Sequence, residues 1–238
     1  MFLPIYLATT AQEFPNFKEL PSTLCYLACH FSAGGEGLSN LPSALPEHSI
    51  LCADDSTPIS NHKASIVIKQ LNDLIERFNP CGILLDFQRP GNPYTPNMVE
   101  NILMHLSCPV AVSHIYARDY SCPVFLPPLP FRKTISEYLS PWKGREIWLE
   151  IENDKEMAIV TEESFGVEQV CSIPNGIIQF RESSLLCHYC TQIKQDHIAL
   201  FFHRTAQDLE ELQMQAQKYG VTKFLGLWQQ LRQFYSPR

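Results

Sequence analysis

The segment GILLDFQRP at residues 82–90 indicates both the fold and the site of this chain. Gly82 to Leu85 form an apolar run, and Asp86, Gln88 and Arg89 follow it closely. An apolar run without alternation is typical of a strand that is buried on both faces in a parallel sheet. Polar side chains just after such a strand lie at its carboxyl end, where α/β barrels carry their active sites.

Seven further apolar runs have the same character. Segments of helical periodicity lie between several of them, which is the pattern of a parallel sheet wrapped by helices. Eight strands close a (β/α)8 TIM-type barrel, and 238 residues suffice for one such domain over 1–238. The expected barrel strands are 3–8, 24–31, 49–53, 82–87, 109–113, 146–151, 198–203 and 223–228.

Three of the expected helices carry clear signals. Residues 61–78 place apolar side chains at helical spacing. Thr95 followed by Pro96 predicts a helix start with threonine as the N-cap. Thr205 and Asp208 predict a capping box at the start of a third helix, which Gly220 ends.

Residues 155–196 break the alternation of strands and helices. They hold three short apolar stretches with no helical pattern between them. We therefore expect a small antiparallel β insertion before the seventh barrel strand. Within and beside it, residues 185–191 and 197–204 are expected to pair as a hairpin across Gln195-Asp196.

Composition excludes several classes of function. The net charge of −7, with no offsetting basic cluster, argues against nucleic acid as a partner. No apolar run reaches the ~18–20 residues of a membrane span, and no signal peptide is evident. Nine cysteines at irregular spacing indicate reduced thiols in a cytoplasmic protein.

We expect neither a cofactor nor a metal site. The chain has no glycine-rich phosphate loop followed by Lys and Ser/Thr. The segment CHYC at residues 187–190 lacks the second pair of ligands that structural zinc needs. The expected partner is a small molecule or an oligosaccharide, and the sequence identifies no protein partner.

Most of the expected strand ends offer a polar or aromatic side chain. Asp86 is the first catalytic candidate, because a buried carboxylate needs a partner or a ligand; a structural pair with Arg89 is the alternative. Glu150, on the same side of its strand as Trp148, is the second, either as a site carboxylate or in a salt bridge behind the site. The candidates for ligand binding are Asp54, Asp55, Gln88, Arg89, His114, Tyr116, Tyr189, Arg204, Trp228 and Gln229.

Three of these candidates have equally plausible structural interpretations. Asp54 and Asp55 could hold a cation or orient a ligand, or they could form an Asx turn before Pro58. Trp228 could present its indole to a sugar ring at the barrel mouth, or it could cover the end of the core.

The stretch CGILLDFQ at residues 81–88 resembles the signature of family 18 glycoside hydrolases, the chitinase-like barrels. That signature, DGIDLDWE, ends the fourth barrel strand. Gly82, Ile83, Leu85 and Asp86 match it, and Phe87 stands in the place of its tryptophan. By the same resemblance, Trp228 corresponds to the tryptophan of the eighth strand, and Tyr189 is a candidate for the tyrosine of the family's site.

The departures from the signature concern its chemistry. Gln88 stands where the family has its glutamic acid, and an amide cannot donate the proton that the leaving oxygen requires. The family's nucleophile is the acetamido group of the substrate, and the resemblance implies that Asp86 would orient that group. Cys81 and Leu84 replace the first two aspartates.

Three hypotheses follow from these residues. The first is a degenerate glycoside hydrolase-like barrel that binds a glycan or another small polar ligand without chitinase activity. The second is an active hydrolase of the glycosidase type that uses Asp86 with a relocated acid such as Glu150 or Asp54. The third is a non-enzymatic interaction protein that docks through the 155–196 insertion.

Overall fold

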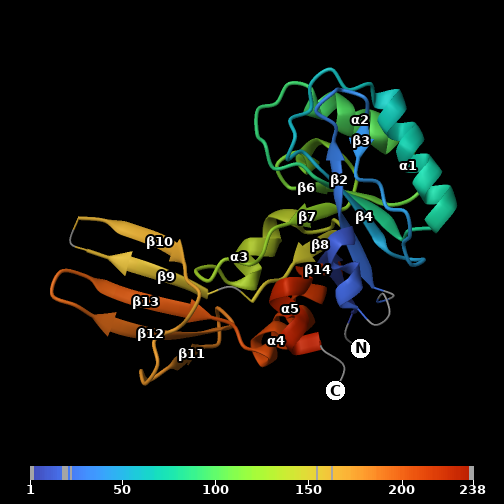
Figure 1. Cartoon of the computed structure of the whole chain (residues 1–238). Helices are drawn as coiled ribbons and strands as arrows, with labels where there is room; N and C mark the ends of the chain where they lie inside the picture. The colour runs from blue at the N-terminus through green and yellow to red at the C-terminus, as the bar shows by residue number, and fades with distance from the viewer. Residues whose placement is uncertain (1–2, 18–20, 22, 154, 162, 236–238) are drawn as a thin grey trace.

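The computed structural model describes residues 3–17, 21, 23–153, 155–161 and 163–235. Eight parallel strands close a barrel, in which the first strand pairs with both the second and the last (Figure 1). The expected (β/α)8 barrel is therefore confirmed. In spatial order its strands are β1 (Ile5–Thr9), β2 (Leu24–Phe31), β4 (Ile50–Asp54), β5 (Gly82–Asp86), β6 (Val110–Ser113), β7 (Val124–Leu126), β8 (Ile147–Glu150) and β14 (Val221–Leu227).

The helices between the strands are of unequal size. The crossing from β6 to β7 holds a 3₁₀ turn, Ala117–Asp119, and Ala11–Asn16 and Ser140–Trp142 are further turns of this kind. A two-residue strand, β3 (Leu38–Ser39), pairs antiparallel with β2 in the loop before β4. The α-helices are α1 (Ala64–Phe78), α2 (Thr95–His105), α3 (Ile135–Leu139), α4 (Ala206–Gln217) and α5 (Trp228–Tyr235).

The structure refines the expected helix starts. Thr205 caps α4 by accepting from the backbone N–H of Asp208, so that capping box is confirmed. The expected N-cap of α2 was wrong by one residue. Tyr94 is the N-cap, and Thr95 is the first helical residue, with Pro96 in the first turn.

One expected barrel strand was wrong. Residues 198–203 lie in a separate antiparallel sheet, and Val124–Leu126 takes the missing place in the barrel. The physical reason is that the true barrel strand is very short, whereas the wrongly chosen strand is longer and alternates in burial. The β7 strand has only three residues and lies between Pro123 and Pro127, whereas 198–203 is longer but alternates, burying Ala199 and Phe201.

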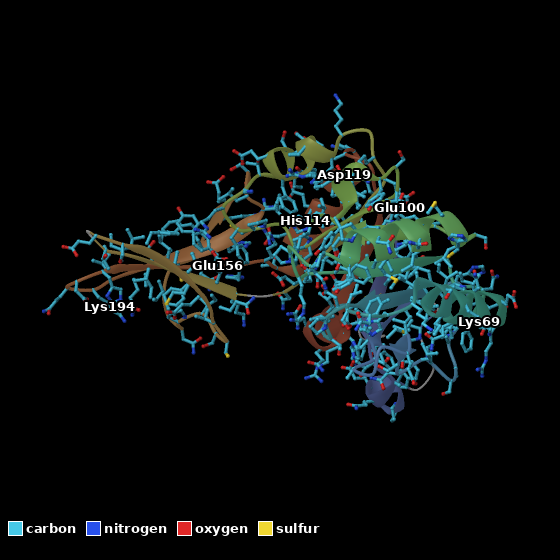
Figure 2. The ribbon with its side chains drawn as sticks, turned by 90° about the horizontal axis from the view of Figure 1, so that it is seen from above. Lys69, Glu100, His114, Asp119, Glu156 and Lys194 are labelled. Carbon is cyan, nitrogen blue, oxygen red and sulfur yellow. The ribbon has the colours of Figure 1, made fainter. Side chains whose placement is uncertain are left out.

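The antiparallel sheet forms an arm, residues 155–203, that follows the seventh barrel strand, β8, and not the sixth as expected. Its hairpin pairing of Cys190 with Phe201 confirms the predicted hairpin. The arm projects beside α3 and α4 (Figure 1), and Lys194 lies at its far end (Figure 2). Its strands, in spatial order, are β10 (Phe165–Gln169), β9 (Lys155–Val160), β13 (Ile198–His203), β12 (Cys187–Ile193) and β11 (Phe180–Glu182).

Arg204 attaches the arm to the barrel. Its side chain is buried, and its N–H groups donate to the carbonyl oxygens of Leu129 (2.8 Å) and Leu186 (3.2 Å). Its guanidinium also lies 4.3 Å from the ring centroid of Phe131. Because Leu129 and Phe131 belong to the segment after β7, the base of the arm is fixed to the rim of the barrel.

The barrel interior is filled by a cluster that is distinct from the layer under the helices. Trp148 is its largest member, and it fits only because residue 82 is glycine. A Cβ at Gly82 would lie 2.6 Å from Cη2 of Trp148 and 3.0 Å from the carbonyl oxygen of Pro109. The buried members of the interior cluster are Ala8, Cys25, Ile50, Cys52, Leu84, Ala111, Phe125, Trp148 and Leu225.

We expect Gly82→Ala to lower the free energy of unfolding by ~1–3 kcal/mol, the usual cost of overpacking a core. Chemical denaturation followed by circular dichroism measures this. Gly166→Ala is the matched control, because a Cβ at that position would meet nothing within 4 Å. Equal stability of the two variants would contradict the packing argument.

Candidate functional site

Three polar side chains stand at one level where neighbouring strands end. His30 on β2, Asp54 on β4 and Asp86 on β5 are consecutive partners in the sheet register. Cys52 and Leu84, two residues earlier on β4 and β5, belong to the interior cluster. Since side chains two apart on a strand point the same way, both aspartates point into the mouth of the barrel.

A pocket of about 480 Å³ opens at these strand ends. It brings together five of the residues that the sequence proposed, although they come from two separate loops. It lies at the C-terminal rim, where barrels of this type carry their sites. Its lining residues are Leu27, Cys52, Asp54, Asp55, Ser56, Asp86, Gln88 and Arg89.

Asp86 is a carboxyl group of the pocket with a perturbed pKa. Burial raises its pKa, and the charges of Asp54 and Asp55 add to this. Hydrogen bonds from the Gln88 amide and from Oγ of Ser113, both to Oδ1, oppose the rise without cancelling it. Asp86 therefore holds its proton more tightly than an ordinary aspartic acid does.

Asp55 has a structural role at the edge of the pocket. Its oxygens accept from the backbone N–H groups of Gln88 (2.9 Å) and Arg89 (3.0 Å), and its side chain is buried. The Arg89 side chain donates to the carbonyl oxygens of Asp55 (2.7 Å) and Ser56 (2.6 Å). These four bonds join the loops after β4 and β5. The suggested Asp86–Arg89 pair is not among the ion pairs of the described residues.

His30 is a site residue that the sequence did not single out. Its Nδ1 lies 2.6 Å from Oδ2 of Asp54 and 3.2 Å from Oγ of Ser56. The other oxygen of Asp54 accepts from the backbone N–H of Ser56 (2.8 Å), as in an Asx turn. His30 lies inside an apolar run, so a search of residues after the runs passes over it. The last inward-pointing residue of a strand would have been the better signal.

The rim next to the pocket holds two more candidates, His114 and Tyr116. The Tyr116 hydroxyl donates to the carbonyl oxygen of Arg89 and so supports the pocket loop. The pKa of His114 is lowered, mainly because its ring is half-buried, and its Nδ1 is buried without a hydrogen bond.

Glu150 ends β8 on the same side of the strand as Trp148, which lies in the barrel interior. Its charge, like that of Asp86, helps to raise the pKa of the buried Cys25 thiol. Glu150 thus reaches the barrel interior, but it does not line the pocket of Asp86.

Four proposed residues lie elsewhere. Tyr189 is in the arm, and Arg204 is at its base, because the strand before it does not belong to the barrel. The Trp228 ring packs 4.5 Å from the ring of Phe17, between centroids, at the start of α5. Gln229 donates to Glu13 (2.9 Å). None of these four lines the pocket.

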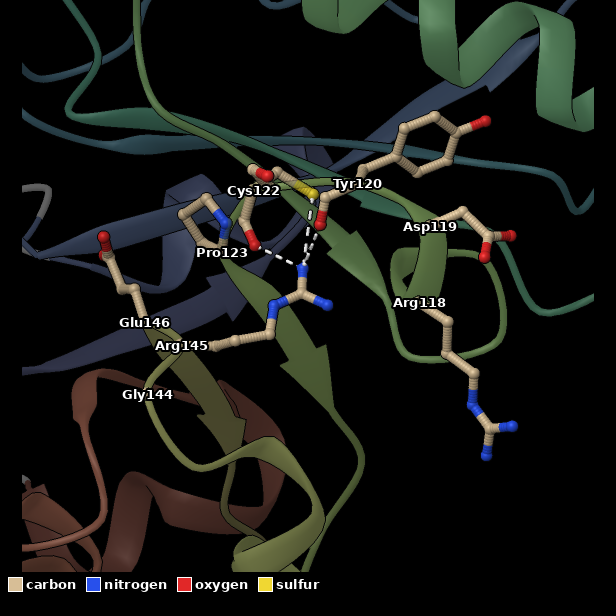
Figure 3. Close-up of a pocket in the computed structure, with 9 residues that line it drawn as sticks. Arg118, Asp119, Tyr120, Cys122, Pro123, Gly144, Arg145 and Glu146 are labelled. Carbon is tan, nitrogen blue, oxygen red and sulfur yellow. Dashed lines mark hydrogen bonds between the residues drawn. The ribbon is translucent and has the colours of Figure 1, made fainter.

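A second pocket, also of about 480 Å³, lies between the loops that precede β7 and β8. It is therefore at the N-terminal end of the strands. The Arg145 guanidinium points at the segment 120–122 and donates to the carbonyl oxygens of Tyr120 (2.8 Å) and Cys122 (2.5 Å) (Figure 3). Side chains at this end of a barrel serve stability, which fits these bonds.

Within the described ranges, no group of three or more His, Cys, Asp or Glu side chains is placed to hold a metal ion. The helices of the same ranges include none that is long and apolar enough to span a membrane.

No protein-family model and no curated protein matches the sequence. Solved structures do match. The spore cortex-lytic enzyme SleL of Bacillus cereus gives a TM-score of 0.60 at 10% identity, over 94% of this chain and 70% of that chain. A double mutant of the GH18 chitinase from Cycas revoluta, in complex with (GlcNAc)4, gives 0.58 at 10% identity, over 93% of each.

The chitinase-like agglutinin RobpsCRA from Robinia pseudoacacia gives a TM-score of 0.54 at 8% identity, over 92% of this chain and 93% of that chain. At such identities the matches show the fold alone. They confirm the resemblance that the sequence suggested: the chain has a divergent chitinase-like barrel. The segment CGILLDFQ also lies where the signature requires, because β5 is the fourth barrel strand.

We expect Asp86→Asn to raise the free energy of unfolding near pH 7 by ~0.5–2 kcal/mol, as relief of unfavourable charge often does. A carboxyl group whose pKa is higher in the folded chain binds more proton when folded. Its ionisation therefore costs stability once the pH exceeds the ordinary carboxyl range. Urea titrations at pH 4 and pH 7 measure this, and the gain should shrink at pH 4.

Asp55→Asn is the matched contrast. The Asp55 carboxylate accepts hydrogen bonds from two backbone N–H groups. Asparagine has one carbonyl oxygen and one NH2 group, so one of the backbone N–H groups would face that NH2 group and lose its acceptor. We expect a loss of ~1–3 kcal/mol. If Asp55→Asn stabilised the protein and Asp86→Asn destabilised it, the roles that we assign to these two residues would be wrong.

Proposed function

We propose that this chain is a glycoside hydrolase-like barrel that binds a glycan or another small polar ligand in the pocket of Asp54, Asp86 and Gln88. It does so without the glutamate-dependent chitinase reaction of family 18. The observation that carries the proposal is the hydrogen bond from the Gln88 amide to Asp86.

That hydrogen bond concerns the two positions that matter most in the signature. The family's acid stands at the position of Gln88, and an amide has no proton to transfer at neutral pH. Here the amide donates to Asp86 instead, so the side chain is used to hold the carboxyl group. The pair is suited to binding, and Gln88 cannot supply the family's acid.

The chemistry of the pocket suits a polyhydroxylated ligand. The carboxyl oxygens of Asp86 accept hydrogen bonds from the hydroxyl groups of a ligand, and such bonds are short and strong when the carboxyl group is ionised. The Gln88 carbonyl oxygen and the Ser56 hydroxyl add further polar partners, beside the apolar Leu27. A few polar groups on a partly apolar wall are typical of small-molecule sites. The complex of a similar barrel with (GlcNAc)4 supports a sugar as the first ligand to test.

The relocated acids of the second hypothesis gain little support. Glu150 does not line the pocket. Asp54 does, but its two oxygens are engaged by His30 and the backbone of Ser56. Apart from Asp86, the remaining carboxyl group that lines the pocket is that of Asp55. It is unsuited to be the acid, because it accepts hydrogen bonds from the backbone of the next loop.

One observation favours docking through the arm as a second function. Five large apolar side chains are exposed on the same face of its sheet, as the strand register shows. Exposed apolar patches of this kind commonly mark interaction sites. Replacing 155–203 by a short linker would separate the two functions, because the pocket would remain. The five side chains are Phe165, Val167, Phe180, Ile193 and Ile198.

We expect (GlcNAc)4 or soluble peptidoglycan fragments to bind the wild-type protein, and Asp86→Ala to weaken that binding by ~10–100-fold. Loss of a hydrogen bond to a charged group costs ~1.5–3 kcal/mol, and each 1.4 kcal/mol is tenfold in Kd. Isothermal titration calorimetry with millimolar ligand measures the affinities.

Asp119→Ala is the control for this experiment. Asp119 is exposed and lines the pocket at the opposite end of the barrel, so its replacement should leave Kd unchanged. Binding that is equal in wild type and Asp86→Ala would contradict the site, and the lack of any heat with either ligand would contradict the proposed function.

A further inference from the structure

Asp54 holds the imidazole ring of His30 in a fixed orientation. Asp54 accepts from His30 through Oδ2 and from the Ser56 backbone through Oδ1, so both carboxylate oxygens are held in place. A carboxylate that accepts from Nδ1–H leaves the lone pair of the neutral ring on Nε2.

The Nε2 atom of His30 is available to a ligand. In the described part of the chain, the hydrogen bonds of this ring are all made through Nδ1. The side chain is 32% exposed. His30 does not itself line the pocket, but it stands on the side of β2 that faces Asp54 and contacts two residues of the lining, Asp54 and Ser56. An oriented imidazole beside a polar pocket, with one nitrogen open, has the geometry of a general base.

Asp86 stands at the same level of the barrel rim as His30 and is the candidate for the acid that a His30 base requires. His30 and Asp86 are separated by one strand, β4, since each is the sheet partner of Asp54. Two strand spacings amount to ~9–10 Å between their backbones. In direct-displacement glycosidases the side-chain carboxyl groups of the acid and the base stand ~6.5–9.5 Å apart, which leaves room for a water molecule. A carboxyl group whose burial favours the protonated form, as that of Asp86 does, suits the acid.

We propose that His30 and Asp86 form an acid–base pair that hydrolyses a bound β-glycoside by direct displacement, with inversion at the anomeric carbon. The inference rests on the proposed function, since the glycan must first bind in this pocket. His30 and Asp86 are the catalytic residues, and Asp54 is a positioning residue that acts through His30.

The step uses water alone as co-reactant. Nε2 of His30 takes a proton from a water molecule, whose oxygen forms a bond to the anomeric carbon. The bond from that carbon to the glycosidic oxygen breaks, and Asp86 gives its proton to the departing oxygen. Afterwards His30 loses a proton to solvent and Asp86 regains one, so the protein is unchanged. Gln88 takes no part in proton transfer.

The test follows (GlcNAc)4 with the full chain by proton NMR, which distinguishes the anomer released first. We expect slow cleavage in which the α-anomer appears first. His30→Gln should lower kcat at least ~100-fold, the usual contribution of a general base. Asp54→Asn should lower kcat with little change in KM, and the exposed His105→Gln control should leave both unchanged.

Three results would overturn the inference. One is release of the β-anomer first, which would mean retention; this readout needs only the wild-type chain, so it does not depend on how the variants fold. Another is a His30→Gln variant that keeps its kcat. The last is binding of (GlcNAc)4 by calorimetry without any cleavage, which would leave the proposed function standing. Absence of both binding and cleavage would refute the proposed function together with the inference.

Discussion

The hydrogen-bond register of the parallel strands is the constraint on which the site depends. Closure of the barrel forces eight strands to end at one rim, and the register decides which residues stand at the same level. His30, Asp54 and Asp86 share a level because β2, β4 and β5 are neighbours with matched ends. A one-residue slip of β5 would turn Asp86 away from the interior, since strand side chains alternate. The backbone, more than any contact between side chains, therefore assembles the pocket.

Much of the barrel could be predicted from the sequence because strands buried on both faces are nearly continuous in hydrophobicity. The strand at 24–31 was predicted with its observed ends, and the others lie within a few residues of the expected ranges. The three-residue β7 could not be found this way, because a run so short between prolines resembles a loop. The opposite error arose at 198–203, where the strength of the apolar run concealed its alternation.

Residues of the candidate site could be predicted where they follow an apolar run, but not where they lie within one. Asp54, Asp86 and Gln88 come at or just after an apolar run, and the structure brings them together. His30 precedes Phe31 inside its run, so only the register reveals it. Tyr189 was proposed by resemblance to a family, and Trp228 by resemblance and by its position after the last apolar run. Resemblance does not say how this chain folds around its own loops. The partners of Asp55 could not be foreseen either, because they are backbone groups of a different loop.

The ends of the arm have a consequence for how this chain could have arisen. Lys155 and His203, its first and last residues, are partners in the sheet, so the chain leaves and returns at almost the same point. A segment whose ends meet can be lengthened, shortened or exchanged by a single recombination event with little entropic cost to the host. The arm is thus a module in the evolutionary sense, and selection could reshape it while the barrel kept its geometry.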